Sequence, residues 1–148
     1  MLPATTQRVS AHTAAAVNRQ ISRTARDRVN YFASRIPEIP DRLRELDREW
    51  DIERTLEANA STLAFVGVAL AATVDKRWLA LPALVTAFLF QHAVQGWCPP
   101  VPVLRRLGFR TASEIEQERN ALKALRGDFA TLDQYEDKAG AAMRAARA

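Results

Sequence analysis

Residues 58–74 (ANASTLAFVGVALAATV) and 78–97 (WLALPALVTAFLFQHAVQGW) decide the fold of this chain, and only Asp75-Lys76-Arg77 separates them. The first run has no Asp, Glu, Lys or Arg in 17 positions, and the second has none in 20. As α-helices they would be roughly 26 and 30 Å long, against a hydrocarbon core of about 30 Å. We therefore predict an all-α chain built on a two-helix transmembrane hairpin over residues 58–98.

Charge is unevenly distributed along the chain, although the net charge is only +4. Residues 1–36 carry six Arg and one Asp, whereas residues 37–57 carry four Arg and eight acids. A basic segment followed by an acidic one fits contact with anionic lipid, whereas a nucleic-acid surface would interleave aromatic residues with the cations. We expect the lipid bilayer, and no nucleic acid, as a partner.

The sequence contains no pattern typical of a cofactor or metal site. It has one cysteine, which excludes an intramolecular disulfide and an all-cysteine metal cage within one chain. There is also no Gly-rich phosphate loop and no His-Glu-x-x-His helix. We expect neither a metal nor a cofactor.

The segment before the hairpin, residues 1–40, is predicted to be a frayed tail of about ten residues followed by a basic amphipathic helix. Apolar residues recur there every three or four positions, with four arginines mainly off that stripe: Val17, Ile21, Ala25, Val29, Phe32 and Ile36 against Arg19, Arg23, Arg26 and Arg28. Two alternatives remain open for this helix. It lies on the anionic leaflet, or it packs on the protein's own helices.

Prolines at 37 and 40 end that helix and make Ile36-Pro37-Glu38-Ile39-Pro40 the best linker in the chain. Asp41 is expected to cap a charged helix over residues 41–57 that leads into the membrane. No Gly or Pro interrupts the sequence before Gly67, so this helix can run unbroken into the first span.

Residues 99–110 mix apolar side chains with Arg after a cluster of prolines, which suits an interfacial segment returning along the membrane surface. Arg105 and Arg106 would reach lipid phosphate there, and Trp78 and Trp97 would mark the membrane interface at the ends of the second span. Thr111-Ala112-Ser113-Glu114 then reads as a capping box that opens soluble helices over residues 111–148. Their first apolar positions are Ile115, Leu122, Leu125, Phe129 and Leu132.

Small residues line one side of each span. Such strips let helix backbones approach closely in lipid, either within the hairpin or between two copies of the chain. The positions are Ala60, Ala64, Gly67 and Ala71 in the first span, and Ala80, Ala83 and Ala87 in the second.

The distribution of cations indicates an orientation for the hairpin. The turn carries two cations, whereas residues 41–57 carry four Arg and residues 99–111 carry three. The positive-inside rule therefore places both termini of this multi-pass protein in the cytoplasm.

Polar residues gather where the two spans meet the cytoplasm. An antiparallel hairpin would bring the end of the second span level with the start of the first. The cluster expected there comprises Asn59, Ser61, Thr62, Gln91, His92 and Gln95. It is either a structural hydrogen-bonded zipper or a polar pocket beside Cys98.

Cys98 is the candidate reactive group. The spacing makes Gln95 its neighbour on a continued helix and points His92 elsewhere, so it does not support a direct Cys-His nucleophile. Arg105 and Arg106 nearby would lower the thiol pKa and favour a persulfide carrier or a redox-sensitive group. The alternative is a small apolar residue packed at a helix end.

The stretch Gly96-Trp97-Cys98-Pro99 resembles the exit motif of the YgaP-like transmembrane domain, a small bacterial inner-membrane hairpin whose second helix ends in Gly-x-Cys-Pro. The resemblance covers roughly residues 51–107 and implies a dimerising module with Gly96, Cys98 and Pro99 as its motif. Members of that family occur alone or attached to a rhodanese, which moves sulfane sulfur. This chain has no rhodanese loop and no second cysteine, so a partner would have to supply that activity.

We predict a noncatalytic inner-membrane anchor or interaction module that forms a dimer and presents cytoplasmic helices to a protein partner. The alternative is a thiol relay or sensor at the cytoplasmic face, in which Cys98 takes sulfane sulfur or senses oxidant with a partner sulfurtransferase. A third alternative is a soluble helical bundle with the two apolar runs as its core.

Overall fold

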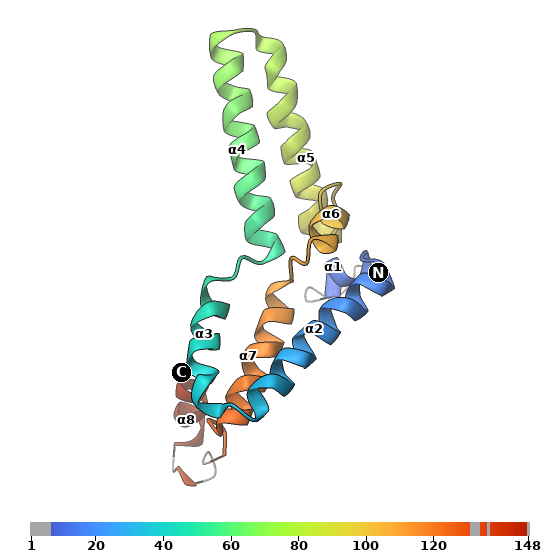
Figure 1. Cartoon of the computed structure of the whole chain (residues 1–148). Helices are drawn as coiled ribbons and strands as arrows, with labels where there is room; N and C mark the ends of the chain where they lie inside the picture. The colour runs from blue at the N-terminus through green and yellow to red at the C-terminus, as the bar shows by residue number, and fades with distance from the viewer. Residues whose placement is uncertain (1–6, 131–133, 136, 148) are drawn as a thin grey trace. The chain divides into compact units, whose positions relative to one another are not determined.

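The computed structural model describes residues 7–130, 134–135 and 137–147, and the regular elements of this part of the chain are all helical (Figure 1). The predicted all-α class is therefore confirmed. The chain divides into two compact units, each assembled from segments that are separate in sequence. The first contains Met1–Gln20 and Trp50–Ala112, and the second contains Ile21–Glu49 and Ser113–Ala148.

A helical hairpin dominates the first unit. Its helices α4 (Ile52–Thr73) and α5 (Ala80–Gln95) lie side by side in opposite directions, joined by the short 3-10 helix η3 (Lys76–Leu79) (Figure 1). Asp51 caps α4 by accepting a 2.7 Å hydrogen bond from the amide of Arg54. Asp75 starts η3 in the same way, with the amide of Arg77 as donor.

Two helices of this chain are long and apolar enough to cross a membrane, by length and composition. The first of these stretches is Ile36–Thr73, and its apolar part lies in α4. The second is Lys76–Gln95, which comprises η3 and α5. Only 17% and 6% of the residues in their most apolar windows are buried inside the protein. The apolar runs are thus largely on the surface of this unit.

The small residues of α4 face α5. Gly67 is buried, and a Cβ atom added there would lie 2.5 Å from Cδ of Pro82. Ala60, Ala64 and Ala71 are half-buried on the same side of the helix, whereas Ala80, Ala83 and Ala87 of α5 are exposed. The strip on α4 therefore serves packing within the hairpin.

The remainder of the first unit closes the open end of the hairpin, which we call the exit. It consists of α1 (Arg8–Ala11), the start of α2 (Ala15–Ala33) and α6 (Val101–Arg106). The frayed tail expected before Ser10 is therefore wrong for residues 8–10, and residues 1–6 lie outside the described part. The core of this end contains Val9, Ile52, Leu56, Cys98 and Val101, with Phe88 and Leu104 packed against it.

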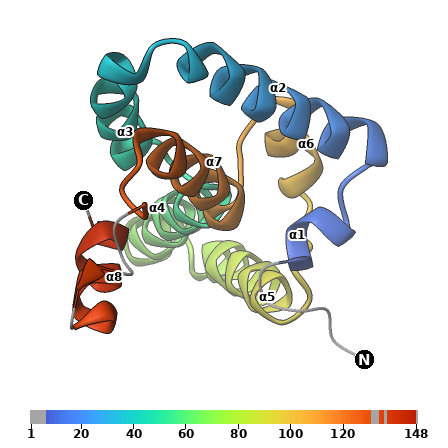
Figure 2. The ribbon, with the colours of Figure 1, turned by 90° about the horizontal axis from the view of Figure 1, so that it is seen from below.

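The second unit packs the rest of α2 with η2 (Ile36–Glu38), α3 (Ile39–Arg48), α7 (Ala112–Arg126) and α8 (Lys138–Arg147). Figure 2 shows α2, α3 and α7 around the core of this unit. That core contains five buried residues and three partly buried ones: Ile39, Leu43, Leu46, Ile115 and Leu122, with Val29, Phe32 and Ile36.

This core decides between the two alternatives for the basic amphipathic helix. Val29, Phe32 and Ile36 from its apolar stripe pack on α3 and α7, so this part of the stripe covers protein. Ile39 is fully buried, which makes the predicted linker a tight turn inside the core.

The expected continuous helix from Asp41 into the first span is wrong. Helix α3 ends at Arg48, Glu49 is extended, and α4 starts anew at Ile52. Asp41 lies in the first turn of α3, where it pairs with Arg44, and the residue at the N-cap is Glu38. The start of α7 directly after Thr111 agrees with the predicted capping box, and Leu132 lies outside the described residues.

A buried carboxylate ties three helices of the second unit together. Glu118 of α7 is 2% exposed and accepts a 2.9 Å hydrogen bond from Nε of Arg42 on α3. Its second oxygen lies 3.6 Å from the guanidinium of Arg28 on α2. Glu118, which interrupts the apolar pattern of α7, thus interacts with two cations from neighbouring helices.

We expect Glu118→Gln to lower the free energy of unfolding of the second unit by about 2 kcal/mol, because it removes the buried carboxylate that pairs with Arg42 and Arg28 and leaves Arg42 only Glu45 and Glu49. The matched control is Glu116→Gln, whose carboxylate is exposed and pairs with Arg119, with an expected loss of under about 1 kcal/mol. Denaturant titration in detergent, followed by circular dichroism, measures both. Equal losses would contradict the role of Glu118.

Candidate functional site

Gly96 of the exit motif is explained by close packing of the N-terminal segment. It ends α5 with φ of +76°, in the left-handed region, and its amide donates a 2.7 Å hydrogen bond to the carbonyl of His92. A Cβ atom here would lie 2.3 Å from Cβ and 2.6 Å from the carbonyl carbon of Arg8. Only glycine therefore allows residue 8 to lie against the end of α5.

Arg8 connects the N-terminal segment to α5. Its guanidinium donates to the backbone carbonyl of Ala93, and the next residue, Val9, is buried beside Leu56 and Cys98. The carbonyl groups of the last turn of a helix lack partners within the helix, and a cation is favourable there. Arg8 thus gives the carbonyl of Ala93 a hydrogen-bond partner and places a positive charge at the end of α5.

Arg105 is 1% exposed and faces the N-terminal segment, which corrects its expected place at the membrane surface. It donates to Oγ1 of Thr13 at 3.2 Å, to Oδ1 of Asn18 at 2.8 Å and to the carbonyl of Phe109 at 3.1 Å. Such a set of bonds compensates a buried guanidinium. Arg106 is exposed, as are Val103 and Leu107 of the same segment.

The two tryptophans differ in exposure. Trp78, at the turn end of the hairpin, is 43% exposed, and Trp97, at the exit, is half-buried. Each lies at an end of the apolar part of α5, so both stay compatible with the predicted interface role.

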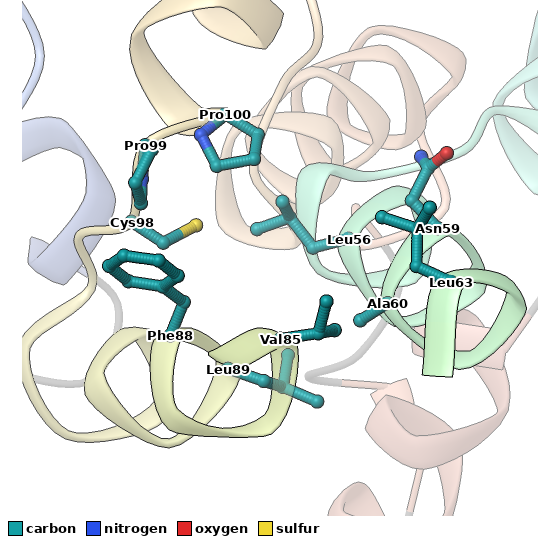
Figure 3. Close-up of a pocket in the computed structure, with 10 residues that line it drawn as sticks. All are labelled: Leu56, Asn59, Ala60, Leu63, Val85, Phe88, Leu89, Cys98, Pro99 and Pro100. Carbon is teal, nitrogen blue, oxygen red and sulfur yellow. The ribbon is translucent and has the colours of Figure 1, made fainter. Parts of the chain in front are cut away.

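Cys98 is 4% exposed and lines an apolar cavity of about 220 Å³ between α4 and α5. Figure 3 shows its sulfur directed into this cavity beside Phe88, Leu56 and Pro100. Burial raises the pKa of the Cys98 thiol, more than a backbone hydrogen bond from Val101 lowers it. The thiol is thus less acidic than usual, contrary to the expected effect of Arg105 and Arg106.

The predicted polar cluster is not joined across the helices. Asn59 and Thr62 donate to carbonyls of their own helix, those of Thr55 and Ala58 at 2.8 Å. Among the described residues no hydrogen bond connects Asn59, Ser61 or Thr62 to Gln91, His92 or Gln95. Asn59 instead lies level with Val85 and Phe88 along the apolar cavity, deeper in the hairpin than His92.

The residue of α4 that lies level with His92 is Glu53. Both line a cavity of about 320 Å³, which we call the exit cavity, together with Arg8, Leu56, Glu57, Leu89 and Ala93. His92 is 5% exposed, and its Nδ1 atom is buried without a hydrogen-bond partner. Oε2 of Glu53 is buried and unpartnered in the same way.

Glu53 lies in the first turn of α4, near the carboxylate of Asp51 and the cations of Arg8 and Arg105. Sequence analysis placed Glu53 in a solvated charged face and missed this role. Counting from the turn at residues 75–77 places residue 92 opposite about residue 60, so the sequence offered no signal for Glu53.

No group of three or more His, Cys, Asp and Glu side chains that could hold a metal ion occurs within residues 7–130, 134–135 and 137–147. The titratable groups that line the exit cavity are one guanidinium, two carboxyl groups and one imidazole, from Arg8, Glu53, Glu57 and His92.

No protein-family model matches the chain, and no curated protein or solved structure is significantly similar to it. The resemblance to the YgaP-like domain therefore stays a prediction.

Alkylation of Cys98 by N-ethylmaleimide in detergent is expected to be at least about tenfold slower than that of an exposed cysteine, because the thiol is buried and its pKa is raised. The control is Leu107→Cys in a Cys98→Ser chain, since Leu107 is 71% exposed on the neighbouring segment. Mass spectrometry follows both. Equal rates at neutral pH would restore Cys98 as a candidate relay.

Proposed function

We propose that this chain is a noncatalytic module of the bacterial inner membrane, in which α4 and α5 span the bilayer and the helical second unit is cytoplasmic. The exposed apolar surface of the hairpin carries the proposal. Its outward side chains include Phe65 at 75% exposure and Phe90 at 72%, with Val68, Leu79 and Leu84 each more than half exposed. A continuous apolar surface of this kind would be unfavourable in water and suits lipid.

The same observation counts against the soluble-bundle alternative. A core helix of a soluble bundle would be mostly buried, whereas the apolar windows of these two helices are 17% and 6% buried. The orientation follows the positive-inside rule, with the two cations of the turn outside and the Arg-rich flanks inside. The resemblance of Gly96, Cys98 and Pro99 to the YgaP-like motif agrees with this assignment.

The thiol relay receives no support from the geometry. A relay needs an accessible thiolate, whereas Cys98 is part of the core of the exit and burial raises the pKa of its thiol. Pro99, the third residue of the motif, follows Cys98 in the turn that leads to α6. This position indicates a structural role for Pro99.

We also propose that the chain forms a dimer and that α5 provides the contact between the two copies. The strip on α4 is occupied by α5, while Ala80, Ala83 and Ala87 are exposed on the outer side of the hairpin. Small residues at four-residue spacing allow a second helix to approach closely in lipid. Ala83 and Ala87 have this spacing, so a dimer would form through α5.

Fluorescence energy transfer between two labelled copies in bacterial membranes tests the proposal. The full chain is expected to stay in the membrane after a carbonate wash and to show transfer that the double variant Ala83→Leu, Ala87→Leu lowers about threefold or more. The matched control is Ala69→Leu with Ala72→Leu, which enlarges two exposed alanines of α4. Release by carbonate would contradict the membrane span, and equal transfer in all chains would contradict the α5 interface.

A further inference from the structure

The apolar cavity beside Cys98 lies in the seam between α4 and α5. On the turn side the seam is closed, because Pro82 lies against Gly67. Nearer the exit, the side chains leave about 220 Å³ between the helices. The lining residues on α4 extend from Leu56 to Leu63, which is about 10 Å along the helix axis. The cavity thus follows the seam over about two turns of helix.

The lining of this cavity is unfavourable for water. The atoms that the described residues expose in it are apolar, and the amide of Asn59 donates to the carbonyl of Thr55 in its own helix. Figure 3 shows this amide at the edge of the cavity, on the side far from Cys98. A cavity of about 150 Å³ with an apolar lining stays dry and binds apolar molecules, because water needs polar partners. This cavity therefore takes an apolar ligand.

The cavity is continuous with the outer surface of the hairpin. Leu63 lines it and is also 47% exposed, and Pro99 and Pro100 are exposed at its exit end. In the proposed membrane span this surface faces lipid, so acyl chains surround the mouth of the cavity. A chain that enters gains the dispersion contacts that the lining residues would otherwise lose.

A second copy bound through α5 would leave the cavity open. The proposed dimer contact uses Ala83 and Ala87, whereas Val85 lines the cavity. Val85 is two residues from each of them, and two residues correspond to about 200° around a helix. The cavity and the dimer contact are therefore on opposite sides of α5, and the apolar partner that remains for the cavity is lipid.

We propose that the cavity holds part of one acyl chain of a phospholipid from the leaflet at the exit. The glycerol end of the chain lies beside Pro100, and the chain then passes the sulfur of Cys98 and the ring of Phe88. Its deeper carbons reach Leu63 and Val85. This order follows from the hairpin, because Cys98 lies beyond the end of α5, whereas Leu63 and Val85 lie within the apolar runs. A length of about 10 Å is about a third of the hydrocarbon core, so the site holds a segment of a chain and the headgroup stays outside.

Photolabelling from lipid tests the proposal, because the thiol of Cys98 faces the cavity and is only 4% exposed to the surroundings. The full chain is placed in phosphatidylcholine vesicles with a trace of lipid whose acyl chain carries a diazirine, either near its glycerol end or at its methyl end. Mass spectrometry measures the adduct on Cys98. We expect the glycerol-end probe to label Cys98 at least about fivefold more than the methyl-end probe, since Cys98 lies at the interface end of the cavity. Equal labelling by the two probes, or no labelling by either, would overturn the proposal.

A variant that fills the cavity should lose the label. Ala60→Leu places a larger side chain in the cavity and is expected to lower labelling of Cys98 by the glycerol-end probe about fivefold or more. The matched control is Ala69→Leu, which enlarges an exposed alanine of the same helix and should leave labelling unchanged. Circular dichroism checks the helix content of each variant. If Ala60→Leu loses helix, Val85→Phe takes its place, with the same expected loss, and unchanged labelling in a folded variant would contradict the site.

The acyl-chain site rests on the proposed membrane span, and the carbonate wash of the full chain separates the two. A chain that stays in the membrane without the expected labelling of Cys98 loses only the acyl-chain site, whereas a chain released by carbonate loses the membrane span itself.

Discussion

The close approach of α4 to α5 at Gly67 and Pro82 determines the geometry of the first unit. With no side chain at residue 67, the ring of Pro82 lies where a Cβ atom would be, and this contact sets the register of the hairpin. Leu56 then lies level with Leu89, and Glu53 with His92. A shift of the register by one turn would separate the carboxyl group from the imidazole and leave both without a common cavity.

The exit of the hairpin is closed by chain from before and after it. Gly96 admits the backbone of Arg8, Val9 fills the core beside Cys98, and Arg105 holds Thr13 and Asn18. The glycine and the cysteine of the exit motif are therefore explained by packing. Within the described part of the chain, the buried side-chain atoms without a hydrogen-bond partner at this end belong to Glu53 and His92, which lie outside the motif.

Much of the fold could be predicted from local sequence, because long apolar runs and prolines act over a few residues. The two long helices, the turn at residues 75–77 and the start of α7 follow from such signals. The break between α3 and α4 does not, since the amide of Ile52 donates to the carbonyl of Arg110, which is distant in sequence. Asp51 as the cap of α4 was visible in the sequence but was assigned to a charged surface.

The candidate site lies at the end of the hairpin where the sequence predicts a polar cluster, but it contains mostly different residues. His92 was identified, whereas Glu53 and Arg8 were not, because their contribution depends on the helix register and on a contact across more than 80 residues. Arg105 was assigned to lipid because its long-range partners cannot be read from spacing. Burial of Cys98 likewise depends on the N-terminal segment, which showed no periodicity.

The membrane span is the basis of this account, and the most direct test is the accessibility of its two ends from outside the cell. In a Cys98→Ser chain, Lys76→Cys marks the turn and Leu107→Cys marks the segment after the exit, and both positions are exposed in the protein. A membrane-impermeant maleimide should label Lys76→Cys in intact bacteria and Leu107→Cys only after the cells are opened. Labelling of neither position before lysis, or of both, would contradict a hairpin that spans the bilayer with cytoplasmic termini.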